Sequence, residues 1–149
     1  MYKKILFPTD LSDAAPQIVP HLLAIANKFD AEIHILFVAR MLDYFASIYV
    51  TQTTIKGFQD EVVSGAGKKL DEFVKEHFKG YSPCKTHVLI GDPAEKILEF
   101  KRSEGIDLVV IGSHGRKGID RIVFGSVAET VVRKSQVPVM TIHPTREGM

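Results

Sequence analysis

Short apolar segments alternate with longer segments of helical spacing along most of the chain, and this alternation most constrains the fold. A short apolar run between turn residues is typical of a buried strand, whereas apolar residues that recur every three or four positions are typical of an amphipathic helix. We therefore predict strands at residues 5–7, 32–38, 85–90, 107–111 and 137–142. Helices are predicted at about 16–29, 55–78, 94–102 and 125–134.

Strands that alternate with helices indicate a parallel sheet, because right-handed crossovers between parallel strands place helices over both faces. The segments 5–7 and 108–111 are entirely apolar, as is usual for central strands that are buried on both faces. A length of 149 residues suits a single hydrophobic core. The sequence therefore predicts one α/β domain over residues 1–149.

The overall composition excludes several classes of protein. The net charge is +1, so no general attraction to nucleic acid or to an acidic membrane is expected. No apolar run approaches the roughly 18 residues of a membrane span, and the first apolar run is too short for a signal peptide. The single cysteine, Cys84, excludes an internal disulfide and is interpreted as a quiet small side chain. We expect a cytoplasmic protein.

The stretch GSHGRKGIDRIVFGS, residues 112–126, links the apolar run 108–111 to a predicted helix. Gly112 and Gly115 let the backbone turn tightly, so that their N–H groups could line an anion pocket. Gly125 and Ser126 are predicted to begin the next helix, whose free N–H groups and positive dipole end favour a phosphate. Composition alone favours a simpler interpretation, a glycine-rich turn before a capped helix. Further positive charge could come from His114, Arg116, Lys117 and Arg121.

The expected position of this stretch in the sheet strengthens the anion-site interpretation. In open parallel sheets, ligands bind beyond the carboxyl ends of the strands, where the strand order reverses. If strands 5–7 and 107–111 are central neighbours, the segments 8–10 and 112 onward meet at that point, beside Val38 at the end of another strand. Asp10 could bind a ligand there or, like Ser12 and Asp13, cap the following helix. Its position favours binding.

Two common phosphate-binding motifs are absent from the sequence, the P-loop and a G-x-G-x-x-G after the first strand. What remains is Gly112-x-x-Gly115, nine further residues, and then Gly125-Ser126. This spacing resembles the G-x-x-G-(nine residues)-G-[ST] signature of the ATP-binding branch of the universal stress protein family. The resemblance extends to KKILFPTDLSDAA at 3–15, GDPAEKIL at 91–98 and all of 107–142, and it is weakest over 39–54.

The resemblance implies a flavodoxin-like doubly wound sheet of strand order 3-2-1-4-5, with ATP, ADP or AMP held between strands one and four. It places Asp10 near the ribose and phosphates, where Asp10 could help hold magnesium or manganese, and it brings the backbone of Val38 to the adenine. One departure is Leu11-Ser12, where many relatives have Gly-Ser at the rim of the pocket. The binding residues that the resemblance implies are Pro8, Thr9, Asp10, Val38, Gly112, His114, Gly115, Arg116, Gly125, Ser126 and Val127.

The sequence leaves three functions open. The leading hypothesis is a regulatory protein in which nucleotide bound at the 112–126 loop biases a dimer or partner surface, because no general base or nucleophile is evident and Ser126 is interpreted as a phosphate contact. A slow ATPase would use Asp10 to hold a metal and Arg116 to stabilise developing charge. A dimeric scaffold would bind no nucleotide. The histidines lack metal-ligand spacing and are expected in solvent or on strand surfaces, namely His21, His34, His77, His87 and His143.

An apolar edge strand predicts self-assembly. In the order 3-2-1-4-5 the last strand is an edge, and its sequence VPVMTIH carries little protective charge. We predict a two-fold homodimer through this strand, from Val137 to His143. The long connection 39–54 contains Tyr44, Phe45 and Tyr49, which are interpreted first as core or partner packing and second as a lid over the nucleotide.

Overall fold

The computed structural model describes residues 1–40, 52–113 and 119–144, without the side chains of residues 52, 53 and 119–124. Each predicted strand and helix is present. In chain order the elements are β1 (Lys4–Pro8), α1 (Ala15–Phe29), β2 (Glu32–Ala39), α3 (Gln52–His77), β3 (Cys84–Ile90), α4 (Pro93–Ser103), β4 (Leu108–Gly112), α5 (Ile119–Lys134) and β5 (Val139–Ile142).

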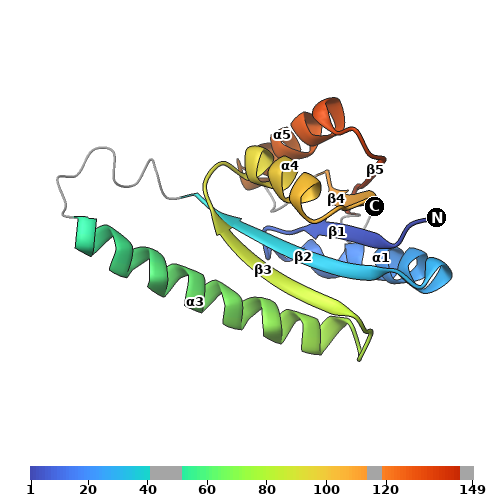
Figure 1. The fold of residues 1–149 in the computed structure, drawn as a ribbon, viewed down its shortest axis with the longest axis horizontal. Helices are drawn as coiled ribbons and strands as arrows, with labels where there is room; N and C mark the ends of the chain where they lie inside the picture. Colours follow the sequence, from blue (N-terminus) through green and yellow to red (C-terminus); the bar gives the residue numbers. More distant parts are fainter. Residues whose placement is uncertain (41–51, 114–118, 145–149) are drawn as a thin grey trace.

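The five strands form one parallel sheet in the order β3-β2-β1-β4-β5 (Figure 1). β1 pairs with β2 from Lys4 opposite Glu32, and with β4 from Ile5 opposite Leu108. The order confirms the expected flavodoxin-like α/β fold, with β1 and β4 as central neighbours. β3 and β5 form the two edges.

Two apolar layers cover the sheet, one on each face. α1 and α3 pack on one face, where Ile18, Val19 and Leu22 of α1 and Leu70 of α3 lie against alternate residues of the strands. α4 and α5 pack on the other face around Leu6, Leu36, Val109 and Ile111, and contribute Ile97, Phe100, Val127, Ala128 and Val131. Figure 1 shows α4 and α5 above the sheet and α3 below it. Because strand side chains alternate between the faces, each central strand is buried on both sides.

The start of α5 differs from the prediction. The helix begins at Ile119, so Gly125 and Ser126 lie inside it and do not begin it. No proline interrupts residues 119–124, and a single interior glycine costs a helix only about 1 kcal/mol. The backbone N–H groups of Gly125 and Ser126 are therefore not at a helix end, and the predicted dipole contribution at that point is wrong.

The long helix α3 also begins earlier than predicted, at Gln52. Its first half extends beyond the sheet (Figure 1), and among the side chains of residues 54–77 the first buried one is Ala66. Residues 41–51 lie outside the described residues, and with them the aromatic residues of the 39–54 connection. Within the described ranges, no helix combines the length and apolar composition needed to cross a membrane.

Candidate functional site

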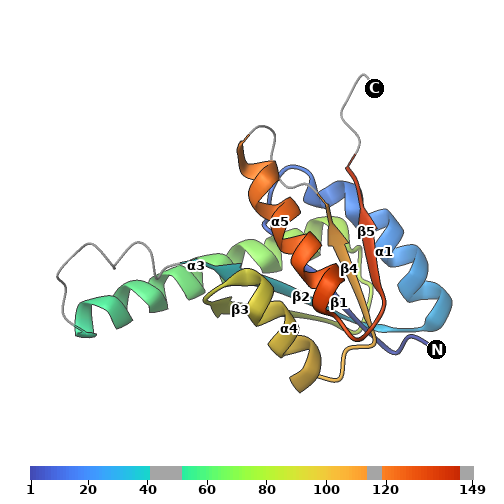
Figure 2. The ribbon, with the colours of Figure 1, turned by 90° about the horizontal axis from the view of Figure 1, so that it is seen from above.

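The carboxyl ends of β1 and β4 form the reversal point of the sheet. From β1 the chain continues to α1 on one face, and from β4 it continues to α5 on the other (Figure 2). The predicted position of the reversal is therefore confirmed. At this point the two connections diverge, so backbone and side chains from both strands can surround a ligand.

The turn after β1 is held by its own polar groups. Pro8 ends the strand and is buried, and Thr9, only 5% exposed, donates its backbone N–H to Leu36 O at 2.9 Å. Thr9 Oγ1 accepts from Leu11 N at 3.1 Å, and Asp10 Oδ1 accepts from Ser12 N at 2.9 Å. The turn thus fixes Asp10 at the reversal point with one carboxylate oxygen engaged.

Asp10 does not cap α1. The N-cap residue is Ala14, which makes no side-chain hydrogen bond to the helix, and Pro16 at the start of the helix has no N–H to offer. The prediction that Asp10, Ser12 or Asp13 caps the helix is therefore wrong. The helix begins after these residues, and none of their side chains bonds to its first N–H groups.

Leu11 adopts a left-handed backbone conformation with φ of 58°. This conformation costs an L-residue about 1–2 kcal/mol but is free of strain for glycine. The side chain of Leu11 packs against the core on the α1 face, and this packing offsets part of the cost. Leu11 therefore keeps the conformation of the turn, although its backbone is strained.

Ser12 is a site residue whose importance the sequence did not indicate. The residue is 7% exposed, and its Oγ has no hydrogen-bond partner. A buried polar group without a partner typically costs about 1–3 kcal/mol. The sequence indicated Ser12 only as a candidate helix cap and as part of Leu11-Ser12 at the rim of the expected pocket.

Ser113 follows β4 directly and links the reversal point to the end of β5. Its backbone N–H donates to Ile142 O at 3.0 Å, and its Oγ lies 3.1 Å from His143 Nδ1 at the end of β5. A Cβ atom added to Gly125 would lie 2.9 Å from Ser113 O, closer than such contacts occur. Gly125 therefore lets α5 approach the end of β4, and it brings the two glycine ends of the 112–126 stretch together.

The remaining predicted site residues are placed as follows. Gly112 is buried at the end of β4. Val38 lies near the end of β2, on the α4 face, and Ser126 is exposed on α5. The side chain of Val127 is 3% exposed and belongs to the core beneath α5. His114, Gly115 and Arg116 lie outside the described residues.

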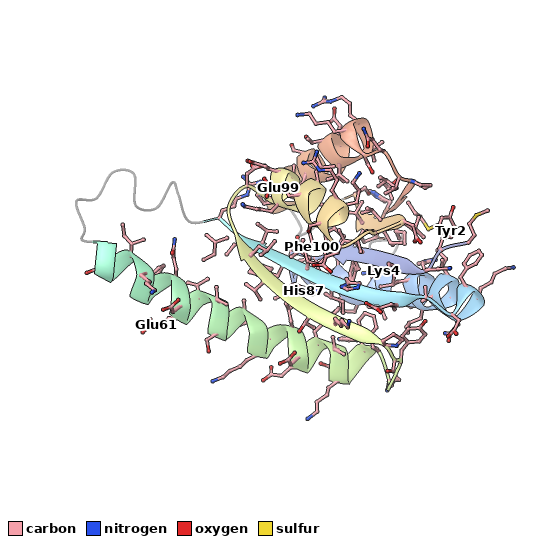
Figure 3. The ribbon with its side chains drawn as sticks, in the orientation of Figure 1. Tyr2, Lys4, Glu61, His87, Glu99 and Phe100 are labelled. Atoms are coloured by element: carbon pink, nitrogen blue, oxygen red, sulfur yellow. The ribbon has the colours of Figure 1, made fainter. Side chains whose placement is uncertain are left out.

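One histidine, His34, was predicted wrongly. His34 is not on a surface but is 2% exposed, and its Nδ1 lies 2.9 Å from His87 Nε2 on the neighbouring strand. The His34 ring packs against Phe100 of α4, and so does the His87 ring (Figure 3). The reason is that α4 covers this part of the sheet, so a polar side chain on the central strand β2 is enclosed.

The chemistry of the other candidate groups is limited. Burial raises the pKa of the Cys84 thiol to about 11, so the thiol stays protonated near neutral pH and is a poor nucleophile. Among the residues with described positions, no group of three or more His, Cys, Asp or Glu side chains could hold a metal ion.

Comparisons with known proteins agree on one family. The model of the universal stress protein family matches residues 1–143. The universal stress protein MJ0531 of Methanocaldococcus jannaschii is 33% identical over 148 residues, which cover 95% of this chain and 82% of that protein.

Solved structures show the same fold. The structure of MJ0577 from the same organism has a TM-score of 0.82 at 30% identity, and the match covers 99% of both chains. A universal stress protein family member from Arabidopsis thaliana, solved with AMP bound, has a TM-score of 0.66 at 20% identity, covering 97% of this chain and 94% of that one.

Proposed function

The chain belongs to the universal stress protein family, and from this premise we propose that it is a regulatory protein that binds an adenine nucleotide between β1 and β4. The observation that carries the proposal is the close approach of Gly125 to Ser113 O at the reversal point of the sheet. This approach brings the ends of the glycine stretch together where the parallel sheet offers a ligand position. The AMP-bound relative from Arabidopsis thaliana supports the same class of ligand.

The residues at this point fit a nucleotide. Thr9 and Asp10 lie at the end of β1 in a turn whose hydrogen bonds are already formed, so little ordering is needed on binding. Asp10 would face the ribose and phosphates and share a magnesium or manganese ion with them. The backbone of Val38 would meet the adenine. The phosphates would be bound by the backbone of Gly112 and Gly115 and by the hydroxyl of Ser126, flanked by His114, Arg116 and Val127, with Pro8 as part of the wall. Gly125 lies inside α5 and would let that helix approach the bound phosphates.

Regulation would run through β5. The site and this edge strand are directly connected, because Ser113 bonds to Ile142 and to His143. Met140 on the same strand is 40% exposed, which supports pairing with a second copy. We propose a homodimer through Val137–His143 whose formation nucleotide binding biases. We also propose a cytoplasmic location, where adenine nucleotides are abundant.

Equilibrium binding to the nucleotide-free protein tests the proposal. We expect saturable binding of ATP, ADP or AMP, measured calorimetrically with and without magnesium. Sedimentation of the same samples should show a dimer whose dissociation depends on the nucleotide. If none of the three nucleotides binds under either condition, the protein is instead a scaffold and the proposal is wrong.

A further inference from the structure

The first half of α3 carries apolar side chains beyond the end of the sheet. α3 spans 26 residues, from Gln52 to His77, and Figure 1 shows its first half extending past the strands. Among the described residues, the apolar layer on this face of the sheet takes its α3 members only from Leu70 onward. Phe58 and Val63 precede that part of the helix and are 39% and 37% exposed in the single chain. A second molecule could therefore cover them.

The exposed side chains continue the face of α3 that packs on the sheet. Ile55, Val62 and Ala66 recur at intervals of seven and four residues, so they lie on one face of the helix. Val63 flanks this face on one side and Phe58 flanks it on the other. The buried Ala66 marks the point at which the same face meets the body of the protein. The first half of α3 thus presents an apolar stripe, residues 55, 58, 62 and 63, beyond the sheet.

Local helix stability does not explain a helix in this position. An isolated helix shorter than about 12–15 residues is marginal in water, and each interior glycine costs about 1 kcal/mol relative to alanine. The segment 54–67 contains Gly57, Gly65 and Gly67, and a Cβ atom added at any of them would meet nothing within 4 Å. Packing against described parts of the chain therefore does not require these glycines. An apolar contact along the stripe would stabilise this part of the helix.

The charges beside the stripe are complementary to those of a second copy of the same helix. Lys56 lies in the first turns of α3, and Asp60 and Glu61 follow about one turn later. When two copies pack antiparallel about a two-fold axis near Gln59, Lys56 of each copy meets the acidic pair of the other. In a parallel alignment in register, each charge would instead face its own like, which is unfavourable. The charge order therefore favours an antiparallel pair.

We propose that the first half of α3 is an interface at which two copies of this chain pack through antiparallel helices. In this arrangement Ile55 of each copy lies against Val62 of the other, and Phe58 and Val63 become more fully buried. The interface is separate from the proposed pairing of β5, because α3 packs beside the edge strand β3 and β5 is the opposite edge. The two interfaces together join dimers into larger assemblies, and the α3 interface does not depend on nucleotide binding.

Sedimentation of Val63→Glu tests the interface on the full chain. A charge inside an apolar contact is unfavourable, so the assembled mass should fall by about half or more relative to the intact protein at the same concentration. Ser64→Glu is the matched control. It adds the same charge at an exposed position on the face of α3 opposite the stripe, and it should leave the assembled mass unchanged.

Cysteine cross-linking tests the antiparallel alignment independently. Gln59→Cys would lie beside the two-fold axis, so the new cysteines of two copies should form a disulfide under mild oxidation. Glu72→Cys is the control, because Glu72 is exposed on the part of α3 that covers the sheet, and it should not cross-link. Cys84, the natural cysteine, is replaced by alanine in both proteins. This pair of variants decides the question if Val63→Glu does not fold.

The outcomes separate the possible occupants of the stripe. An unchanged assembled mass in Val63→Glu, or equal cross-linking from positions 59 and 72, would overturn the proposal. A lower melting temperature of Val63→Glu with no change in assembled mass would assign the cover to residues 41–51 of the same chain, and it would also overturn the proposal. These variants lie away from the proposed nucleotide site, so a failure to bind nucleotide leaves the interface standing.

Discussion

Two buried polar regions of the molecule differ in how they are satisfied. His34 lies under α4 with His87, Glu32 and Phe100 around it, and Ser12 lies in the turn after β1. His34 Nε2 is 2.6 Å from Glu32 Oε1, although it lies outside hydrogen-bond geometry, and Nδ1 is 2.9 Å from His87 Nε2. Ser12 Oγ has no partner.

The location of each region accounts for the difference. The histidine pair lies where β2 and β3 run side by side, and a helix closes over it, so its partners must come from the protein. Ser12 lies at the carboxyl edge, where the chain diverges and a ligand can supply the partner. We therefore expect changes at the histidine pair to affect stability and changes at the edge to affect binding. The predictions below test this separation.

The largest expected effect is on stability, from His34→Ala. The substitution leaves a cavity beneath Phe100 and removes the partner of His87, so the free energy of unfolding should fall by about 2–4 kcal/mol. Urea denaturation measures the change, and His21→Ala, at an exposed position on α1, is the control. Nucleotide affinity should be unchanged. A large loss of affinity in a folded His34→Ala protein would contradict the separation of the two regions.

Gly125→Ala should affect the other region. The new Cβ would lie 2.9 Å from Ser113 O, so α5 must move away from the end of β4. We expect nucleotide affinity to fall at least about tenfold, or ~1.4 kcal/mol, measured by calorimetry. Gly65→Ala is the matched control, because a Cβ at that position of α3 meets nothing within 4 Å. Equal affinity in the two variants would exclude Gly125 from the binding site.

Acid should destabilise the histidine pair. Burial lowers the pKa of His87, and a charge on His34 lowers it further, while Glu104 and Glu32 oppose this and Lys85 adds to it. The unfolded chain takes up the His87 proton near the ordinary value of 6.5, so it binds more protons than the folded chain just below that pH. The contribution of neutral His87 to the free energy of unfolding is fully present above pH 6.5. It is lost as the pH falls toward the lower pKa that His87 has in the folded chain.

Urea denaturation between about pH 7.5 and about pH 5.5 measures this effect, because it brackets the ordinary histidine pKa. His87→Gln should flatten the stability profile over that range. Burial raises the pKa of Glu32, but hydrogen bonds and charge from Lys85 and His34 outweigh burial and hold this pKa below 4.5. The lowest pH of the measurement therefore stays above the pH range in which Glu32 takes up a proton. An unchanged slope in His87→Gln would show that another group controls the acid response.

The sequence predicted the backbone arrangement better than the polar contacts. Apolar runs located all five strands, and the turn from apolar to polar after Phe7 and Ile111 located the reversal point, because burial of a parallel sheet requires such runs. The contact of His34 with His87 could not be predicted, since it depends on strand register and on the position of α4. The unpartnered state of Ser12 likewise depends on where α1 begins, a boundary that local sequence signals fix poorly.

Asp10→Asn should have the smallest effect on stability. It tests whether a residue at the carboxyl edge of the sheet affects binding without affecting the fold. An asparagine side-chain oxygen can still accept from Ser12 N, so the free energy of unfolding should change by less than about 0.5 kcal/mol. The loss of negative charge should nevertheless reduce the dependence of ATP binding on magnesium, measured by titration at several metal concentrations. Asp13→Asn, an exposed neighbour on the same connection, should leave that dependence intact. If Asp10→Asn instead unfolds the protein while binding by the remaining folded fraction is normal, the turn after β1 serves the fold, as the histidine pair does.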